Sequence, residues 1–218
     1  MATSLARKPI IPRTPKAVRG STCIQANIKY TNDMIALRRI TPTDTCDWER
    51  FIALYIESFP EKERRPIDSL EHLASACDMF KAEVIETEHG FAGFLTHWDL
   101  GEFIYGEHFA VSAQIRGGGI GGRVIDMFTS RFDKTIVLEA ETATDDMSRR
   151  RLGFYARHGF IAAPYPYAQP AYSPQQKPVP MHLLSYGRQL SEEEFNAIRS
   201  KIYKTVYNIA EQRNSVQR

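Results

Sequence analysis

Five glycines fall within the seven residues from Arg116 to Gly122, which read RGGGIGG. Glycine loses more backbone entropy on folding than any other residue, so such a cluster destabilises the chain unless the bare backbone is needed. Glycine permits positive φ and lets a ligand lie against backbone N–H groups, and the apolar helix predicted to follow adds the positive end of its dipole. The segment therefore predicts a phosphate-binding loop.

Two nucleotide-binding motifs are the first candidates for this loop. A nucleotide-hydrolysing P-loop requires Lys and then Ser or Thr after its glycines, and neither follows Gly122. The dinucleotide fingerprint G-x-G-x-x-G is matched by Gly117, Gly119 and Gly122, and Glu139 stands about twenty residues further on, at the end of the next predicted strand. A nucleotide-binding oxidoreductase fragment is therefore an alternative, provided that parallel strands surround the loop.

The elements predicted around the loop do not form such a doubly wound sheet. Three strands precede the loop with short links between them, which indicates an antiparallel meander, and only two strands follow it. We expect one α/β domain with a central, mostly antiparallel sheet flanked by helices. The expected strands are 34–40, 82–86, 91–98, 102–111, 135–141 and 182–186, and the expected helices are 44–59, 67–80, 120–132, 146–158 and 191–212, with a proline- and tyrosine-rich loop over 164–180.

On this background, two motifs resemble those of the GNAT superfamily of acyl-CoA-dependent N-acyltransferases. The run from Arg116 to Gly121 resembles the family's R-x-x-G-x-G pyrophosphate loop, and the run from Phe154 to Phe160 resembles its F-Y-x-x-x-G-F signature. Both occur in the family's order, with one strand between them, and the resemblance covers roughly residues 36–186. It implies a GNAT-type three-layer fold and an enzyme that transfers an acetyl group from acetyl-CoA to a primary amine, without a metal.

The resemblance assigns the coenzyme A site to the glycine loop, the end of the strand before it and the helix that contains the second motif. A backbone N–H near Val111 is expected to polarise the thioester carbonyl. Ser148 and Arg151 stand where the family often has Asn and Ala, so a hydroxyl and a guanidinium take those places. The expected cofactor-binding residues are Phe109, Ala110, Val111, Arg116, Gly117, Gly118, Gly119, Ile120, Gly121, Gly122, Ser148 and Arg151.

Acetyl transfer to an amine needs a base and an acid. An alkyl amine with a pKa near 10.4 is almost entirely protonated at neutral pH, so a base assists its attack. Glu107 is the first candidate, because the family commonly places a carboxylate on this strand, and His108 is the alternative. Strand alternation puts Glu107 on one face with Tyr105 and Phe109, and His108 on the other. The resemblance makes Tyr155 the general acid beside the sulfur. Purely structural roles remain the alternative for each residue.

The acceptor site is expected near the charged connector that follows the first helix. Arg64 or Arg65 could bind an acceptor carboxylate bidentately, and Tyr105, Tyr167 and Tyr172 could line the acceptor pocket with rigid amphipathic rings. The sequence does not identify the acceptor, which could be an amino acid, a polyamine, an antibiotic, a peptide N-terminus or a protein lysine. A non-catalytic acyl-CoA-binding domain is a second alternative.

Charge and composition bound the remaining possibilities. The chain has 218 residues and a net charge of +2. Six of its 28 basic residues precede the first acidic residue, Asp33, so the rest of the chain has 22 basic and 26 acidic residues. This mildly acidic body argues against a nucleic-acid partner. No apolar run is long enough to predict a membrane partner, and three scattered cysteines favour a reducing, cytoplasmic setting.

The chain divides by composition into three parts. Residues 1–32 are expected to form a basic, disordered tail, because prolines at positions 9, 12 and 15 interrupt any amphipathic targeting helix. Residues 33–190 are expected to form the acyltransferase domain, and residues 191–218 a C-terminal helix packed on it. The expected partners are acetyl-CoA and an amine, and a homodimer is left open.

Overall fold

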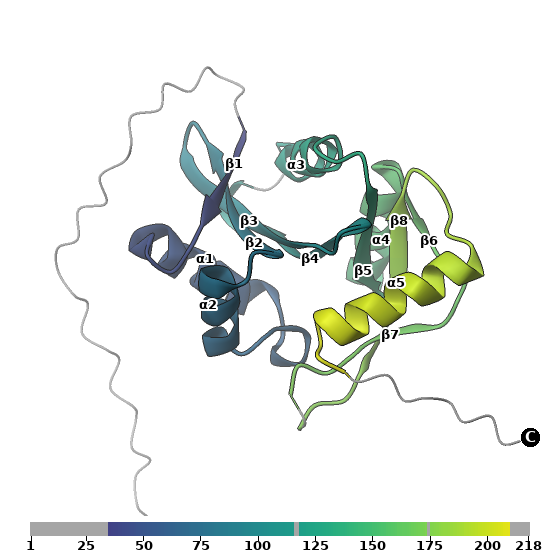
Figure 1. Cartoon of the computed structure of the whole chain (residues 1–218). Helices are drawn as coiled ribbons and strands as arrows, with labels where there is room; N and C mark the ends of the chain where they lie inside the picture. Colours follow the sequence, from purple (N-terminus) through teal and green to yellow (C-terminus); the bar gives the residue numbers. More distant parts are fainter. Residues whose placement is uncertain (1–34, 116–117, 174, 210–218) are drawn as a thin grey trace, which may run out of the picture.

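The computed structural model describes residues 35–115, 118–173 and 175–209 (Figure 1), so the basic tail and the predictions for Arg116 and Gly117 lie outside the described residues. The strands are β1 Ala36–Ile40, β2 Phe80–Thr87, β3 Gly90–Asp99, β4 Phe103–Val111, β5 Thr135–Glu141, β6 Phe160–Ala162, β7 Tyr167–Gln169 and β8 Val179–Tyr186. The helices are α1 Thr45–Ser58, α2 Ile67–Ala76, α3 Ile120–Thr129, α4 Asp146–Arg157 and α5 Glu192–Thr205, with short 3₁₀ turns at Glu61–Glu63 and Ala113–Ile115.

All eight strands join one mixed sheet in the order β1-β2-β3-β4-β5-β8-β6, with β7 paired to β8. Among the strands of the described residues, only β4 and β5 pair in parallel, and every other pair is antiparallel. The predicted mostly antiparallel sheet flanked by helices is confirmed. The same topology removes the doubly wound parallel sheet that a dinucleotide-binding domain needs.

Two short strands were not expected from the sequence. β7 lies inside the segment predicted as a loop, and β6 lies beyond the end of α4. Each has three residues, too few to show a period-2 pattern. The prediction that helix 67–80 reaches Phe80 was also wrong: α2 ends at Ala76, and Phe80 pairs with Trp98 as the first residue of β2.

The helices cover the sheet on two faces. The largest apolar cluster joins the inner sides of α1, α2 and α5 to one face of the sheet, which we call the α1 face. The other clusters join α3 and α4 to the opposite face, which we call the α3 face. In Figure 1, α3 accordingly lies on the other side of the strands from α1, α2 and α5. No helix among the described residues is long and apolar enough to cross a membrane.

A bulge in β4 changes the direction of its side chains. Thr96 pairs with His108 and His97 pairs with Gly106, so Glu107 is an extra residue that has no partner in β3. As a result, Glu107 and His108 both reach contacts on the α1 face, whereas Phe109 packs on the α3 face. The expectation from strand alternation, which placed Glu107 with Phe109 and opposed them to His108, was wrong for this reason.

The parallel pairing of β4 with β5 is short. It ends at the Gly106–Leu138 pair, although β4 continues to Val111 and β5 to Glu141. Beyond this point no backbone hydrogen bonds join the two strands, so side chains and ligands can occupy the space between them. The catalytic candidates on β4 lie directly after the point of divergence.

Candidate active site

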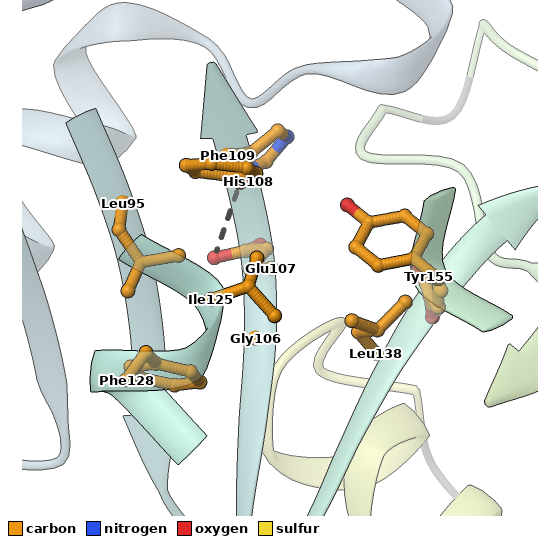
Figure 2. A pocket seen from close by; sticks show the side chains of 10 residues that line it. Leu95, Gly106, Glu107, His108, Phe109, Ile125, Phe128, Leu138 and Tyr155 are labelled. Atoms are coloured by element: carbon orange, nitrogen blue, oxygen red, sulfur yellow. Dashed lines mark ion pairs between the residues drawn. The ribbon is translucent and has the colours of Figure 1, made fainter. Parts of the chain in front are cut away.

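A narrow pocket with a cavity volume of about 20 Å³ lies where β4 and β5 diverge. Apolar side chains from the α3 face, including Leu138, form one part of its wall, and Glu107 and Glu139 also belong to its lining. Figure 2 shows Tyr155 reaching toward this space from α4, with its hydroxyl directed toward β4. The pocket therefore brings together all three catalytic candidates from the sequence, because His108 also belongs to its lining.

Glu107 lies at the centre of a hydrogen-bond network. Its Oε1 accepts from Arg65 Nε and from the Tyr172 hydroxyl, and its Oε2 accepts from Trp98 Nε1, each over 2.8 Å. Burial by itself raises the pKa of Glu107, but the charge of Arg65 and the other donors outweigh burial, so the pKa lies below its ordinary value. Glu107 is therefore a carboxylate that stays ionised at neutral pH.

His108 is held as a neutral imidazole. Its Nε2 lies 3.0 Å from the Glu63 carbonyl oxygen, which can only accept, so Nε2 carries the proton. The ring packs edge-on against Tyr55 and Phe59, at centroid distances of 4.9 and 4.7 Å. Burial lowers the pKa of His108 more than the nearby Glu107 raises it. These contacts are those expected of a histidine with a structural role. Because Nε2 carries the proton, only Nδ1 of His108 can accept one.

Tyr155 is buried between aromatic neighbours on the α3 face. The residue is 8% exposed, and its ring contacts those of Phe154 and Phe160 at centroid distances of 5.3 and 5.7 Å. Burial raises the pKa of Tyr155 to about 12. The hydroxyl therefore keeps its proton throughout the physiological range, as a general acid must before the reaction.

Glu139, on β5, was not a catalytic or substrate-binding candidate in the sequence. The hydroxyl of Tyr167 donates to its Oε1, and that of Tyr207 donates to its Oε2 over 2.9 Å. Burial raises the pKa of Glu139 to about 7 even though these hydroxyls favour the ionised form. A signal was available: alternation along β5 places Glu139 on the face of the buried Val137.

Arg65 is engaged within the protein. Its Nη2 donates to the Val206 carbonyl oxygen over 2.7 Å, its Nε is bound to Glu107, and its guanidinium lies 4.8 Å from the centre of the Tyr172 ring. These contacts occupy two of its donors, so the expected bidentate contact with an acceptor is not preformed. Arg64 is half-buried, and its Nε has no hydrogen-bond partner.

The predicted aromatic residues do come together, although they surround buried carboxylates instead of an open pocket. Tyr105 lies on β4, Tyr167 on β7 and Tyr172 in the segment after β7. Tyr207, which the sequence did not single out, joins them from the end of α5, with its hydroxyl 3.2 Å from that of Tyr105. We call Tyr105, Tyr167, Tyr172 and Tyr207 the tyrosine cluster.

The glycine loop leads into the N-terminus of α3. Gly119 is the N-cap residue with φ +70°, and no atom would lie within 4 Å of a Cβ added at Gly118 or Gly119. Open space over a bare backbone and the positive end of the α3 dipole fit a phosphate. Gly122 has a different reason, because a Cβ there would lie 2.7 Å from the His158 ring. Ile120 and Gly121 are already part of α3.

The remaining coenzyme candidates are divided between the faces of the sheet and the start of α4. Ala110 belongs to the core of the α1 face, and Val111 packs on the α3 face. Ser148 closes a capping box with Asp145, whose carboxylate accepts from the Ser148 hydroxyl over 2.7 Å. Arg151 forms an ion pair with Glu141. Their contacts with coenzyme A stay predictions.

Comparison with known proteins agrees with this geometry. Residues 75–162 match the model of an acetyltransferase (GNAT) domain. A Bacteroides thetaiotaomicron protein assigned to the GNAT family of acetyltransferases is 33% identical, with a TM-score of 0.77 over 80% of this chain and 99% of that chain. No curated protein matches the sequence significantly.

Two more distant structures share the fold at 14% identity. One is a spermidine N-acetyltransferase chimera of Vibrio cholerae SpeG and hSSAT, with a TM-score of 0.52 over 71% of this chain and 95% of that chain. The other is Arabidopsis thaliana NAA60 in complex with a bisubstrate analogue, with a TM-score of 0.53 over 70% of this chain and 97% of that chain. These two structures show the fold alone, whereas the relative at 33% identity, together with the matched domain, shows that this chain belongs to the GNAT family of acetyltransferases.

Proposed function

We propose that this enzyme transfers the acetyl group of acetyl-CoA to a primary amine by direct attack. The observation that carries the proposal is the pocket between β4 and β5, whose lining includes both Glu107, which is ionised, and Tyr155, which is protonated. A reaction that removes a proton from its nucleophile and returns one to its leaving group needs such a pair.

The glycine loop supports acetyl-CoA as the donor. The first turn of α3 presents backbone N–H groups and the positive end of the helix dipole beside the open backbone of Gly118 and Gly119. Phosphates bound there would place the remainder of the coenzyme at the end of β4, from which the thioester can reach the divergent strands. Backbone N–H groups near Val111 would then polarise the carbonyl.

In this proposal, Glu107 receives the proton of the amine, and Tyr155 protonates the departing sulfur. The Tyr155 hydroxyl, with a pKa of about 12, is a weaker acid than a thiol with a pKa near 8.5, so proton transfer to the sulfur is uphill and is completed when the nitrogen of the new amide returns a proton to the Tyr155 oxygen. Glu107 lies in the bulge of β4, and the bulge directs its carboxylate toward the α1 face. The amine would therefore approach from the α1 face.

The acidic surroundings of the pocket favour a cationic acceptor. Glu63, Glu107 and Glu139 are buried or half-buried near the divergence, and burial together with the charge of Glu141 raises the pKa of Glu63. Glu107 is paired with Arg65 and Glu63 with Lys62, so an ammonium group would be stabilised mainly by Glu139 once that carboxyl is ionised. The structural neighbour named as a spermidine N-acetyltransferase also agrees with an amine acceptor, although a shared fold does not determine the acceptor.

The decisive experiment is a thiol-release assay with acetyl-CoA and separate panels of amino acids, polyamines, aminoglycosides, peptides with free N-termini and lysine-containing peptides. We expect one panel to produce thiol and an acetylated amine in equal amounts. Thermal protection by acetyl-CoA without thiol release in any panel would support the non-catalytic acyl-CoA-binding domain instead. Protection by NAD and not by acetyl-CoA would contradict the proposal.

A further inference from the structure

We propose that Glu139 is the terminal proton acceptor of this acetyl transfer, linked to Glu107 by the hydroxyls of Tyr172 and Tyr207. The inference rests on the proposed function and adds to it the destination of the proton that the amine loses. It also gives a role to a buried carboxylate and a C-terminal tyrosine that the mechanism above does not use.

The link between the two carboxylates is continuous. The Tyr172 hydroxyl lies 2.8 Å from Glu107 Oε1 and 3.3 Å from the Tyr207 hydroxyl, which in turn lies 2.9 Å from Glu139 Oε2. Tyr172 donates its single hydrogen to Glu107, and Tyr207 donates its own to Glu139. A phenol oxygen can also accept, so once Glu107 is protonated it can donate to Tyr172 while the Tyr172 hydrogen turns toward Tyr207. Both end members line the same pocket.

The two carboxylates differ in the charge that faces them. Glu107 is bound by the guanidinium of Arg65, which stabilises its negative charge. The hydrogen bonds to Glu139 come from neutral phenols, and the negative charge of Glu107 acts against its ionisation. A proton placed on Glu107 is therefore driven toward Glu139. The pKa directions agree, since that of Glu107 is lowered and that of Glu139 is raised to about 7.

The groups that surround Glu139 come from every element packed against this part of the sheet. Strand β4 contributes Tyr105 and Glu107, and β7 contributes Tyr167. Tyr172 lies between β7 and β8, Tyr203 lies on α5, and Tyr207 lies just beyond α5. The cation of this network, Arg65, faces Glu107, Tyr172 and Tyr207.

The proposed steps balance as follows. The ammonium loses one proton to Glu107, and Glu107 passes this proton to Tyr172. At the same time Tyr172 gives its own proton to Tyr207, and Tyr207 gives its own to Glu139. Each O–H bond that breaks is therefore replaced by a new one. The amine then attacks the carbonyl, the C–N bond forms and the C–S bond breaks, and the sulfur takes the proton of Tyr155. The second proton of the nitrogen returns to the Tyr155 oxygen, and Glu139 releases its proton to solvent.

The test uses the full-length enzyme and compares three variants across the pH range. Glu139→Gln removes the terminal acceptor while keeping its shape, and Tyr207→Phe keeps both carboxylates but breaks the link between them. Tyr203→Phe is the matched control, because its hydroxyl donates to the Ala168 carbonyl oxygen and not to a member of the chain. Acetyl-CoA binding is measured for each by thermal shift, so that a loss of donor binding is separated from a loss of proton transfer.

We expect the wild-type kcat/KM to fall on the acidic side of a pKa near 7. Both Glu139→Gln and Tyr207→Phe should lower kcat about 100-fold and remove this limb, with acetyl-CoA binding retained. Tyr203→Phe should keep the rate and the limb. An unchanged limb and rate in Tyr207→Phe would overturn the proposal, even if Glu139→Gln failed to fold.

A second measurement does not depend on turnover and therefore separates this inference from the proposed function. The C=O stretch of a protonated carboxylic acid can be followed in the wild-type protein by infrared difference titration. We expect a band that titrates near pH 7 in the wild type, is absent from Glu139→Gln, and is present in Glu107→Gln but titrates at lower pH, because the charge of Glu107 no longer raises the pKa of Glu139. The absence of such a band in the wild type would overturn the role of Glu139, whatever amine the enzyme accepts.

Discussion

Arg65 Nε donates to Glu107 Oε1 over 2.8 Å, and the two side chains are only 8% and 0% exposed. The same guanidinium donates to the carbonyl oxygen of Val206, just beyond the end of α5. One side chain thus ties the connector before α2, the bulge of β4 and the C-terminal segment together. The active-site carboxylate is therefore also part of what holds three distant segments in place.

We predict that Arg65→Met destabilises the protein by about 3–5 kcal/mol, because it leaves the Glu107 carboxylate buried without its cation. Replacing both partners, as Arg65→Met with Glu107→Leu, should restore much of this loss, because no unpaired charge remains. Urea unfolding at pH 7 gives both values.

The exposed pair of Arg188 with Glu194 supplies the control, since its side chains are 53% and 40% exposed. Arg188→Met should leave the urea midpoint almost unchanged. Equal midpoint shifts for Arg65→Met and Arg188→Met would show that the buried pair is not the structural link described here.

Tyr155→Phe should lower kcat about 100-fold while leaving the affinity for acetyl-CoA unchanged. The variant keeps the ring that contacts Phe160 and removes only the proton that the leaving sulfur is proposed to take. Tyr186→Phe is a suitable control, since that residue is 41% exposed at the end of β8. Full turnover by Tyr155→Phe would assign the residue to packing alone.

The sequence allowed the sheet, its flanking helices and the position of the glycine loop to be predicted, because these depend on local periodicity and backbone freedom. It did not allow the directions of His108 and Phe109 to be predicted. A bulge depends on how two strands pair and leaves no mark in the alternation of one strand.

The polar contacts of the site were also beyond local patterns. Arg65 and Glu107 are separated by 42 positions, and Tyr207 lies 68 positions from Glu139. In the sequence, Glu139 is a polar residue near the end of a predicted strand. Only the packing of α5 and β7 in the folded protein shows that its carboxylate is buried. Residue types near the chemistry could be predicted, but their partners are set by tertiary structure.

Glu139 should make stability fall as pH rises. Its pKa is about 7 in the folded protein against an ordinary 4.5, so between these values the folded state holds a proton that the unfolded chain has released. This contribution is fully present below pH 4.5 and is lost as pH rises through 7. At about 1.4 kcal/mol per pKa unit, it amounts to about 3 kcal/mol.

Glu139→Gln resembles the protonated carboxyl and should lack this dependence. Its stability relative to the wild type should therefore increase by about 3 kcal/mol between pH 4.5 and pH 8, as measured by urea unfolding of both proteins. A constant difference between the two proteins across this range would mean that the carboxyl of Glu139 does not titrate near neutrality.

The glycine loop allows ligand binding to be separated from folding. Gly118→Ala places a methyl group in open space without the strain of positive φ, so stability should change by less than about 0.5 kcal/mol. If phosphates lie against this backbone, the same methyl group should weaken acetyl-CoA about tenfold in a calorimetric titration. Gly101→Ala is the converse control: its φ of +87° makes alanine cost about 1–2 kcal/mol, yet it lies before β4 and should bind acetyl-CoA normally. Equal acetyl-CoA affinities for Gly118→Ala and the wild type would place the coenzyme away from this loop.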